Sequence, residues 1–187
     1  MRQPDKKTIS CLESHVIFHG VPAPDLELLV PFLNLETFKK RSVIIAESSE
    51  GSALYVITSG LVEIIKTLPE TPRRKPLTVK LAELRQGDSF GEMELLDTMR
   101  RSASVVAMKK TTCLVFTTGA FLKLYELRPE AYRIITLNLA RELSRRLRAA
   151  DNRIMELDEE LERFKHYLAA ERRRAKKPEP VKVTWSA

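Results

Sequence analysis

The order of hydrophobic and polar positions changes twice along the chain. Up to about Leu35 the apolar residues recur at helical spacing. From about Phe38 to Thr117, short β-branched runs alternate with glycines and other turn residues, as the strands of a small domain do. Helical spacing returns from Gly119 to about Arg174. We therefore predict four segments: N-terminal helices (1–37), a β-rich domain (38–128), a long helix (129–174) and a tail (175–187).

The β-rich segment predicts a small antiparallel roll, similar to a jelly roll. Its strand-like runs are short and regularly spaced, at 43–45, 54–57, 61–65, 77–81, 104–106 and 113–116. Ser59-Gly60 separates two of the runs as a tight hairpin does. Leu68 to Pro76 holds three prolines and three consecutive basic residues, which is typical of an exposed loop. Together with the flanking helices, this pattern predicts the α+β class.

The long helix carries a heptad repeat. Its a positions are Leu147, Ile154, Leu161 and Leu168, and its d positions are Leu143, Ala150, Leu157 and Phe164. In a parallel pair of such helices, each g residue faces the e residue of the partner's next heptad. Those pairs are Arg146–Asp151, Arg153–Asp158 and Glu160–Lys165, all of opposite charge. We expect a homodimer through a parallel coiled coil, with an amphipathic helix folded back on its own domain as the alternative.

Composition and charge exclude several classes of protein. Hydrophobic residues make up 43% of the chain and charged residues 30%, and no apolar run approaches the length of a membrane span. The polar N-terminus leads into no signal-like apolar stretch, so we expect a cytoplasmic protein. The net charge is +7, but the excess lies toward the C-terminus. The globular part, residues 1–132, holds 18 basic and 16 acidic side chains and is nearly neutral, which argues against a broad nucleic-acid-binding face.

Few residues suggest metal, redox or catalytic chemistry. The two cysteines, Cys11 and Cys113, are too few for an iron–sulfur cluster, and we interpret both as small buried hydrophobic residues. His15 and His19 lie four residues apart, and we interpret them as packing residues rather than ligands of a metal or haem. No nucleophile–base set or Walker-type loop is present in the sequence. We therefore expect neither enzyme activity nor a metal.

The segment from Gln86 to Val105 holds residues suited to a cyclic phosphate. Gly91 lets the backbone approach an anion closely, and a short helix beginning near Glu92 would direct backbone N–H groups at it. Arg101 adds a charged, forked donor, Ser102 adds a hydroxyl, and Ala103 keeps the wall small. Glu92 would repel a phosphate, so it makes chemical sense only as the acceptor of a hydrogen bond from the ribose 2′-hydroxyl.

This segment resembles the phosphate-binding cassette of the cyclic-nucleotide-binding family, which includes catabolite activator protein and the regulatory subunits of cyclic-AMP-dependent kinase. The residues that carry the resemblance run from Phe90 to Leu96 and from Arg101 to Val105, and Gly51 to Gly60 resembles the family's early β-roll hairpin. The resemblance covers about Phe18 to Leu147. It implies a bound cyclic nucleotide, with cyclic AMP favoured over cyclic GMP. The binding residues that it implies are Leu81 at the base, Phe90, Gly91, Glu92, Met93, Arg101, Ser102 and Ala103.

Two positions depart from the family pattern. Glu94 stands where the family usually has alanine, glycine or serine, and it would oppose the phosphate charge if its side chain turned inward. Arg146 and Leu147 fall where catabolite activator protein has hydroxyl residues that touch the base. The sequence therefore leaves two interpretations open. One is a dimeric sensor of cyclic AMP or cyclic GMP; the other is a nucleotide-independent dimeric scaffold, with Glu92 and Arg101 paired in a degenerate pocket.

The end of the chain decides how such a sensor is expected to signal. In the family's transcription factors a winged helix-turn-helix domain follows the dimer helix, whereas here few residues follow Arg174. We therefore expect signalling through contacts with an unidentified protein partner, and no DNA binding. The basic cluster at 171–177 could touch nucleic acid or an anionic membrane, or simply end the helix. The strand-like stretch 181–185 with Trp185 could dock on a partner or stay frayed.

Overall fold

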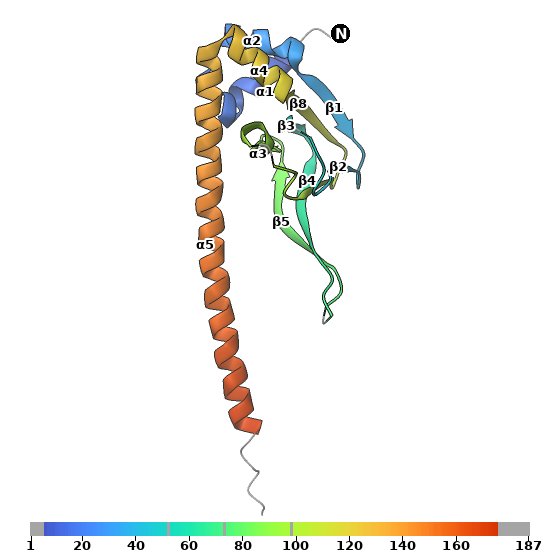
Figure 1. The fold of residues 1–187 in the computed structure, drawn as a ribbon, viewed down its shortest axis with the longest axis vertical. Coiled ribbons are helices and arrows are strands. Elements are labelled where there is room, and N and C mark those ends of the chain that lie inside the picture. The colour runs from blue at the N-terminus through green and yellow to red at the C-terminus, as the bar shows by residue number, and fades with distance from the viewer. Residues whose placement is uncertain (1–5, 52, 73, 98, 176–187) are drawn as a thin grey trace, which may run out of the picture. The chain divides into compact units, whose positions relative to one another are not determined.

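The structure is a computed structural model that describes residues 6–51, 53–72, 74–97 and 99–175. It divides into two compact units, the first ending at Glu142 and the second beginning at Leu143, and each is described by itself. The first unit contains two β-sheets with helices around them, and the second is a helix (Figure 1). The predicted α+β class is confirmed.

The N-terminal segment forms four short helices: α1 (Lys6–Ser14), η1 (Val16–Phe18), α2 (Ala23–Leu29) and η2 (Val30–Phe32). His15 is buried and caps η1, because its Nδ1 atom accepts a hydrogen bond from the Ile17 amide at 3.3 Å. This is a packing role, as the sequence suggested. Strand β1 (Asn34–Phe38) then begins earlier than the predicted start of the β-rich segment at residue 38. Pairing with a distant strand, which local spacing does not reveal, makes Asn34 to Thr37 extended.

Eight strands form two four-stranded antiparallel sheets. One has the order β1-β8-β3-β6 and the other the order β2-β7-β4-β5. Figure 1 shows β4 and β5 running beyond the other strands as a long hairpin. The bounds after β1 are β2 (Val43–Ile45), β3 (Ala53–Ser59), β4 (Leu61–Leu68), β5 (Leu77–Arg85), β6 (Ser89–Phe90), β7 (Ser104–Ala107) and β8 (Thr111–Thr117).

The turn at Gly60 is not the hairpin that the sequence predicted. Strands β3 and β4 belong to different sheets, so the chain turns a corner from one sheet to the other at this glycine. Gly60 has a φ of +112°, and a Cβ there would lie 2.6 Å from the Cα of Thr111. The backbone crossing requires both the positive φ and the missing side chain. A true hairpin lies farther on, where β4 and β5 are joined through a bridge between Thr71 and Arg74.

Two hydrophobic clusters hold the first unit together. The larger one joins the N-terminal helices to β3, β8 and the two C-terminal helices, with Phe18, Phe116 and Phe121 in edge-to-face contact. The smaller one fills the space between the sheets and includes Phe90 and Cys113. Cys113 is fully buried, as expected, whereas Cys11 is half-buried. Burial raises the pKa of the Cys113 thiol to about 12, which keeps it protonated.

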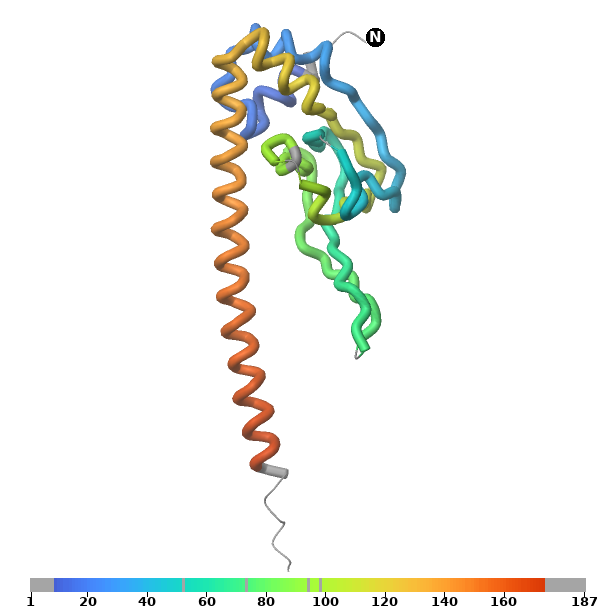
Figure 2. Tube along the Cα trace, viewed as in Figure 1, coloured from blue at the N-terminus to red at the C-terminus, as the bar shows by residue number. Residues whose placement is uncertain are grey.

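Helix α4 (Thr118–Leu127) leads into α5 (Pro129–Ala175), whose first turns pack in the core. The Thr117 hydroxyl caps α4 by accepting from the Ala120 amide, and Pro129 takes the first position of α5. The Nδ2 atom of Asn138 donates to the carbonyls of Ile17 and His19 at 3.1 and 2.8 Å, which ties α5 to the N-terminal helices. Figure 2 shows this meeting of the blue and gold segments. The predicted long C-terminal helix is confirmed.

The second unit consists of the remainder of α5. From Leu147 to Ala170 every residue is exposed in the single chain, including the apolar heptad positions. Over the described ranges, no helix has the length and apolar character needed to cross a membrane. Residues 176–187 lie outside the described part, and with them Trp185 and the end of the basic cluster.

Candidate cyclic nucleotide site

Arg101 is the buried centre of the predicted cassette. Only 5% of its surface is exposed, and its guanidinium donates from Nη1 to the Gly91 carbonyl at 3.3 Å and from Nη2 to the Ala53 carbonyl at 3.2 Å. Its backbone is fixed too, because its amide donates to the Ser49 carbonyl and its carbonyl accepts from the Ser48 amide. A guanidinium has five N–H donors in a rigid fork. The two carbonyls therefore orient the group, whose rigid charged fork is chemically suited to an anion.

Gly91 lies against this guanidinium and cannot be replaced without movement. Its φ is +78°, and a Cβ at this position would lie 2.6 Å from the Ala53 carbonyl oxygen and 2.8 Å from Nη1 of Arg101. Gly51 approaches the same side chain from the loop before β3, where a Cβ would lie 3.5 Å from Nη2. Two glycines thus bring backbone close to Arg101, as a site for a compact charged group requires.

The short helix predicted near Glu92 is present as α3 (Met93–Leu96). Glu92 precedes it in helical conformation, is 4% exposed, and its carbonyl accepts from the Leu95 amide at 3.1 Å. The first amides of a helix have no acceptors within the helix, so they can donate to an anion. The buried Glu92, the helical turn α3 and the buried Arg101 therefore follow one another along the predicted cassette.

Other predicted residues lie farther from the guanidinium or serve the core. Phe90 is 1% exposed and stacks on Tyr55 with ring centroids 5.0 Å apart, so it supports the cassette from within the core. Met93 is 44% exposed, Ser102 is exposed and Ala103 is half-buried. Leu81 is on β5 in the other sheet and is 56% exposed. The hydrogen bond from Arg101 thus joins it to Gly91 directly, whereas Leu81 lies on another strand of the other sheet.

The structure adds residues that the sequence analysis did not single out. Ala53 supplies a carbonyl to Arg101, and Arg100 ties the preceding loop by donating to the Ser48 carbonyl at 3.2 Å and to Glu50 at 2.8 Å. Ser48 has a φ of +63°, a strained value for a residue with a side chain. Backbone carbonyls carry no sequence signal, but Gly51 marked this loop as a place of close approach. The loop between β2 and β3 is therefore part of the cassette.

The two positions that depart from the family pattern, Glu94 and Arg146, do not take part in the contacts described above. The side chain of Glu94 lies outside the described part of the structure, and Arg146 belongs to the second unit.

Within the described ranges, no three His, Cys, Asp or Glu side chains are grouped so that they could hold a metal ion. Burial raises the pKa of the neighbouring Tyr55, an effect that Glu36 strengthens and the positive charge of Arg101 opposes.

Comparison with known proteins identifies the class to which this fold and site belong. The family model for the cyclic nucleotide-binding domain matches residues 35–128, about half of the chain. The chain resembles the crystal structure of the Thermus thermophilus catabolite activator protein with a TM-score of 0.64 and 32% identity, over 76% of this chain and 63% of that one. The protein therefore belongs to the cyclic nucleotide-binding domain family.

Two curated relatives show how widely the domain is used. The cyclic AMP receptor protein of Thermus thermophilus is 34% identical over 142 residues, which is 76% of this chain and 60% of the relative. The human cGMP-dependent protein kinase 2 is 28% identical over 118 residues, 63% of this chain and 15% of the kinase. The chain therefore spans about 60% of the length of the first relative and a small part of the second.

Proposed function

We propose that this protein is a dimeric sensor of a cyclic nucleotide, which signals through contacts with another protein. The observation that carries the proposal is the buried cassette, in which Arg101 is oriented by the carbonyls of Gly91 and Ala53 beside the first turn of α3. A buried, positively charged guanidinium favours an anion as its ligand. Family membership makes a cyclic nucleotide the leading candidate.

Each part of a cyclic nucleotide has a candidate partner. Arg101 and the amides of the α3 turn would bind the phosphate, with the wall completed by Ser102 and Ala103. The buried Glu92 carboxylate would accept from the ribose 2′-hydroxyl, and Leu81 would contact the base. Cyclic AMP is favoured because the relative with the higher identity is a cyclic AMP receptor protein, but the match to a cGMP-dependent kinase keeps cyclic GMP as a candidate.

Thermal unfolding of the full chain with each nucleotide tests this part of the proposal. A ligand that binds only the folded protein raises the unfolding temperature, and a concentration of 100 times Kd stabilises by about 2.7 kcal/mol. We expect cyclic AMP to raise the temperature more than cyclic GMP, with 5′-AMP as the control that lacks the cyclic phosphate. Equal temperatures with and without both cyclic nucleotides at millimolar concentration would contradict the sensor.

The exposed seam of α5 supports the dimer. Leu147, Ile154 and Phe164 are 63%, 64% and 56% exposed in the single chain, and every later heptad position up to Leu168 is exposed as well, whereas Leu143 is half-buried. At 1.5 Å per residue, the part of α5 beyond Glu142 is about 50 Å long. An apolar seam of that length favours a second helix as its partner. The three g–e pairs of opposite charge favour a parallel copy of the same chain.

Two of the g and e residues already form ion pairs within the helix. Arg153 contacts Glu156 at 2.8 Å, and Lys165 contacts Glu162 at 2.6 Å. In the dimer these cations would also face Asp158 and Glu160 of the second copy. Exposed ion pairs contribute little individually, so the charges select the orientation while the apolar seam supplies the stability.

The output of the sensor follows from the way α5 is built. Its first turns are part of the core, with Ala131, Ile135 and Leu139 fully buried, and its remainder carries the seam. A ligand that binds more tightly when the first turns of α5 are in one position would therefore shift the remainder of the helix, which carries the dimer seam. Sedimentation and distance measurements between labels on α5, with and without nucleotide, test this coupling. Identical distances in both states would contradict it.

A constitutive scaffold is the second candidate function. It is favoured by Glu94 in the cassette sequence, a carboxylate that would oppose a phosphate if its side chain turned inward. In that case α5 dimerises but nucleotides have no effect on stability or on the dimer. Under either function we infer a binding role rather than catalysis, in the cytoplasmic location expected from the sequence.

A further inference from the structure

The hairpin of β4 and β5 contains an irregularity at the residue assigned to the base. Ile64 pairs with Ala82 and Ile65 pairs with Lys80, so Leu81 is an extra residue in β5 without a partner across the ladder. An extra residue of this kind is a β-bulge, which bends the strand and changes the direction of its side chains. Leu81 is also 56% exposed, so its side chain is accessible to a ligand.

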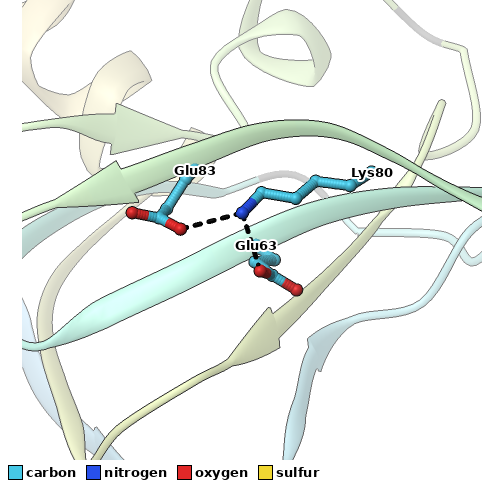
Figure 3. Close-up of polar contacts among 3 residues, drawn as sticks. All are labelled: Glu63, Lys80 and Glu83. Carbon is cyan, nitrogen blue, oxygen red and sulfur yellow. Dashed lines mark hydrogen bonds and ion pairs between the residues drawn. The ribbon is translucent and has the colours of Figure 1, made fainter.

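Three charged side chains on the two strands, Glu63, Lys80 and Glu83, contact one another next to this bulge in the register (Figure 3). The Nζ atom of Lys80 lies 2.8 Å from Oε1 of Glu63 and 2.8 Å from Oε2 of Glu83. Glu63 and Glu83 are directly opposite each other in the register, an arrangement in which two carboxylates repel. Lys80 therefore compensates two negative charges at once. Its hydrogen bonds to them raise the pKa of Lys80, and the same contact lowers the pKa of Glu83.

Lys80 makes one contact along β5 and one contact across to β4, and together they span the bulge. The contact with Glu83 joins residues on either side of Leu81 within β5, and the contact with Glu63 joins β5 to β4. A bulge bends the strand at one position of the ladder. A slip of β5 past β4 would break the contact of Lys80 with Glu63, whereas the contact with Glu83 lies within β5 and spans the bulge.

We propose that the bridge of Glu63, Lys80 and Glu83 is a positioning device that holds Leu81 in place for the nucleotide base. The proposal rests on the proposed nucleotide function, and it extends that function to base selection. The ribose and phosphate would be bound by Glu92, Arg101 and α3 in another part of the chain. Loss of the bridge would therefore change the ratio of the affinities for cyclic AMP and cyclic GMP, which differ only in the base.

Lys80→Met tests the proposal, because it removes the charge while keeping an unbranched apolar stem. Lys66→Met on β4 is the matched control: Lys66 is also 47% exposed and lies next to the bulge in the register, but its ion pair with Glu47 is long, at 3.9 Å, and does not join β4 to β5. We expect Lys80→Met to change the ratio of the two dissociation constants by about threefold, the scale of losing one or two surface ion pairs. Lys66→Met should leave the ratio unchanged, and Lys80→Arg should restore it.

A second measurement tests the effect of the bridge on the bulge independently of nucleotide binding. Amide hydrogen exchange of the unliganded protein should be faster around Leu81 in Lys80→Met than in the wild type, with the rest of β5 unchanged. Unchanged exchange and an unchanged affinity ratio in Lys80→Met would overturn the proposal. If the wild type bound neither nucleotide, the proposed function would fail and base selection with it, while exchange would still decide whether the bridge fixes the bulge.

Discussion

Gly91→Ala is the substitution for which the cassette gives the sharpest expectation. The added Cβ would lie 2.6 Å from the Ala53 carbonyl oxygen, about 0.8 Å short of ordinary contact, and 2.8 Å from Nη1 of Arg101. One of these groups has to move by most of an ångström, and both belong to the hydrogen bonds that orient the guanidinium. A displacement of about 1 Å at a positioned group lowers activity or affinity on the order of 100-fold.

Gly87→Ala is the matched control for the backbone. Gly87 has a φ of +90°, close to the +78° of Gly91, but a Cβ at Gly87 has no atom within 4 Å. Both substitutions therefore carry the cost of a left-handed residue with a side chain, about 1–2 kcal/mol of the free energy of unfolding. Only Gly91→Ala adds the steric conflict with Ala53 and Arg101.

Isothermal titration calorimetry with cyclic AMP, together with urea unfolding, separates the two effects. We expect both variants to lose similar backbone stability, with Gly91→Ala losing more, and only Gly91→Ala to bind nucleotide about 100-fold more weakly. Comparable affinities of Gly91→Ala and Gly87→Ala would refute the reasoning, because they would mean that the carbonyl of Ala53 and Arg101 do not set the geometry of the site.

Three further predictions concern other parts of the molecule. Leu157→Asp with Leu161→Asp should give a monomer by light scattering at micromolar concentration, while Met155→Asp, which is exposed but outside the a and d positions, should stay dimeric; a dimeric double variant would exclude the seam. Arg101→Ala should lower the free energy of unfolding by about 2 kcal/mol, because it leaves the carbonyls of Gly91 and Ala53 without this donor. Arg100→Ala, with an exposed ion pair to Glu50, should lower it by less than about 0.5 kcal/mol, and equal losses would contradict the buried role. Cys113 should resist thiol reagents at pH 8 in the folded protein, since burial raises the pKa of its thiol to about 12, and rapid labelling of Cys113 without denaturant would show that β8 opens.

Periodicity in the sequence predicted the elements of this fold better than their connections. The strand runs, the N-terminal helices and the long helix follow from spacings of two and of three to four residues, which local sequence records directly. The corner at Gly60 was interpreted as a hairpin, because a glycine turn between two strands looks the same whether the strands pair or separate. The start of β1 at Asn34 depends on pairing with β8, far away in the sequence.

The cassette, too, was predicted only in part from the sequence. Gly91, Glu92 and Arg101 were identified from their chemistry and from the resemblance of their segment to the family's cassette, and the structure brings Arg101 into contact with the Gly91 carbonyl. The carbonyl of Ala53 was not predicted, since every residue has a carbonyl and only the fold selects which one meets a guanidinium. The bulge at Leu81 was equally hidden, because a one-residue shift in register depends on how two strands pair.

A calorimetric titration of the full chain with cyclic AMP, repeated with Arg101→Lys, tests the central claim most directly. Lysine keeps the positive charge but lacks the planar fork that bonds to both carbonyls and to a phosphate. The account predicts saturable binding of one nucleotide per chain in the wild type, and binding weakened by at least about tenfold in the variant. Absence of heat in the wild type, or equal affinity in the two proteins, would contradict the assignment of this cassette as a cyclic nucleotide site.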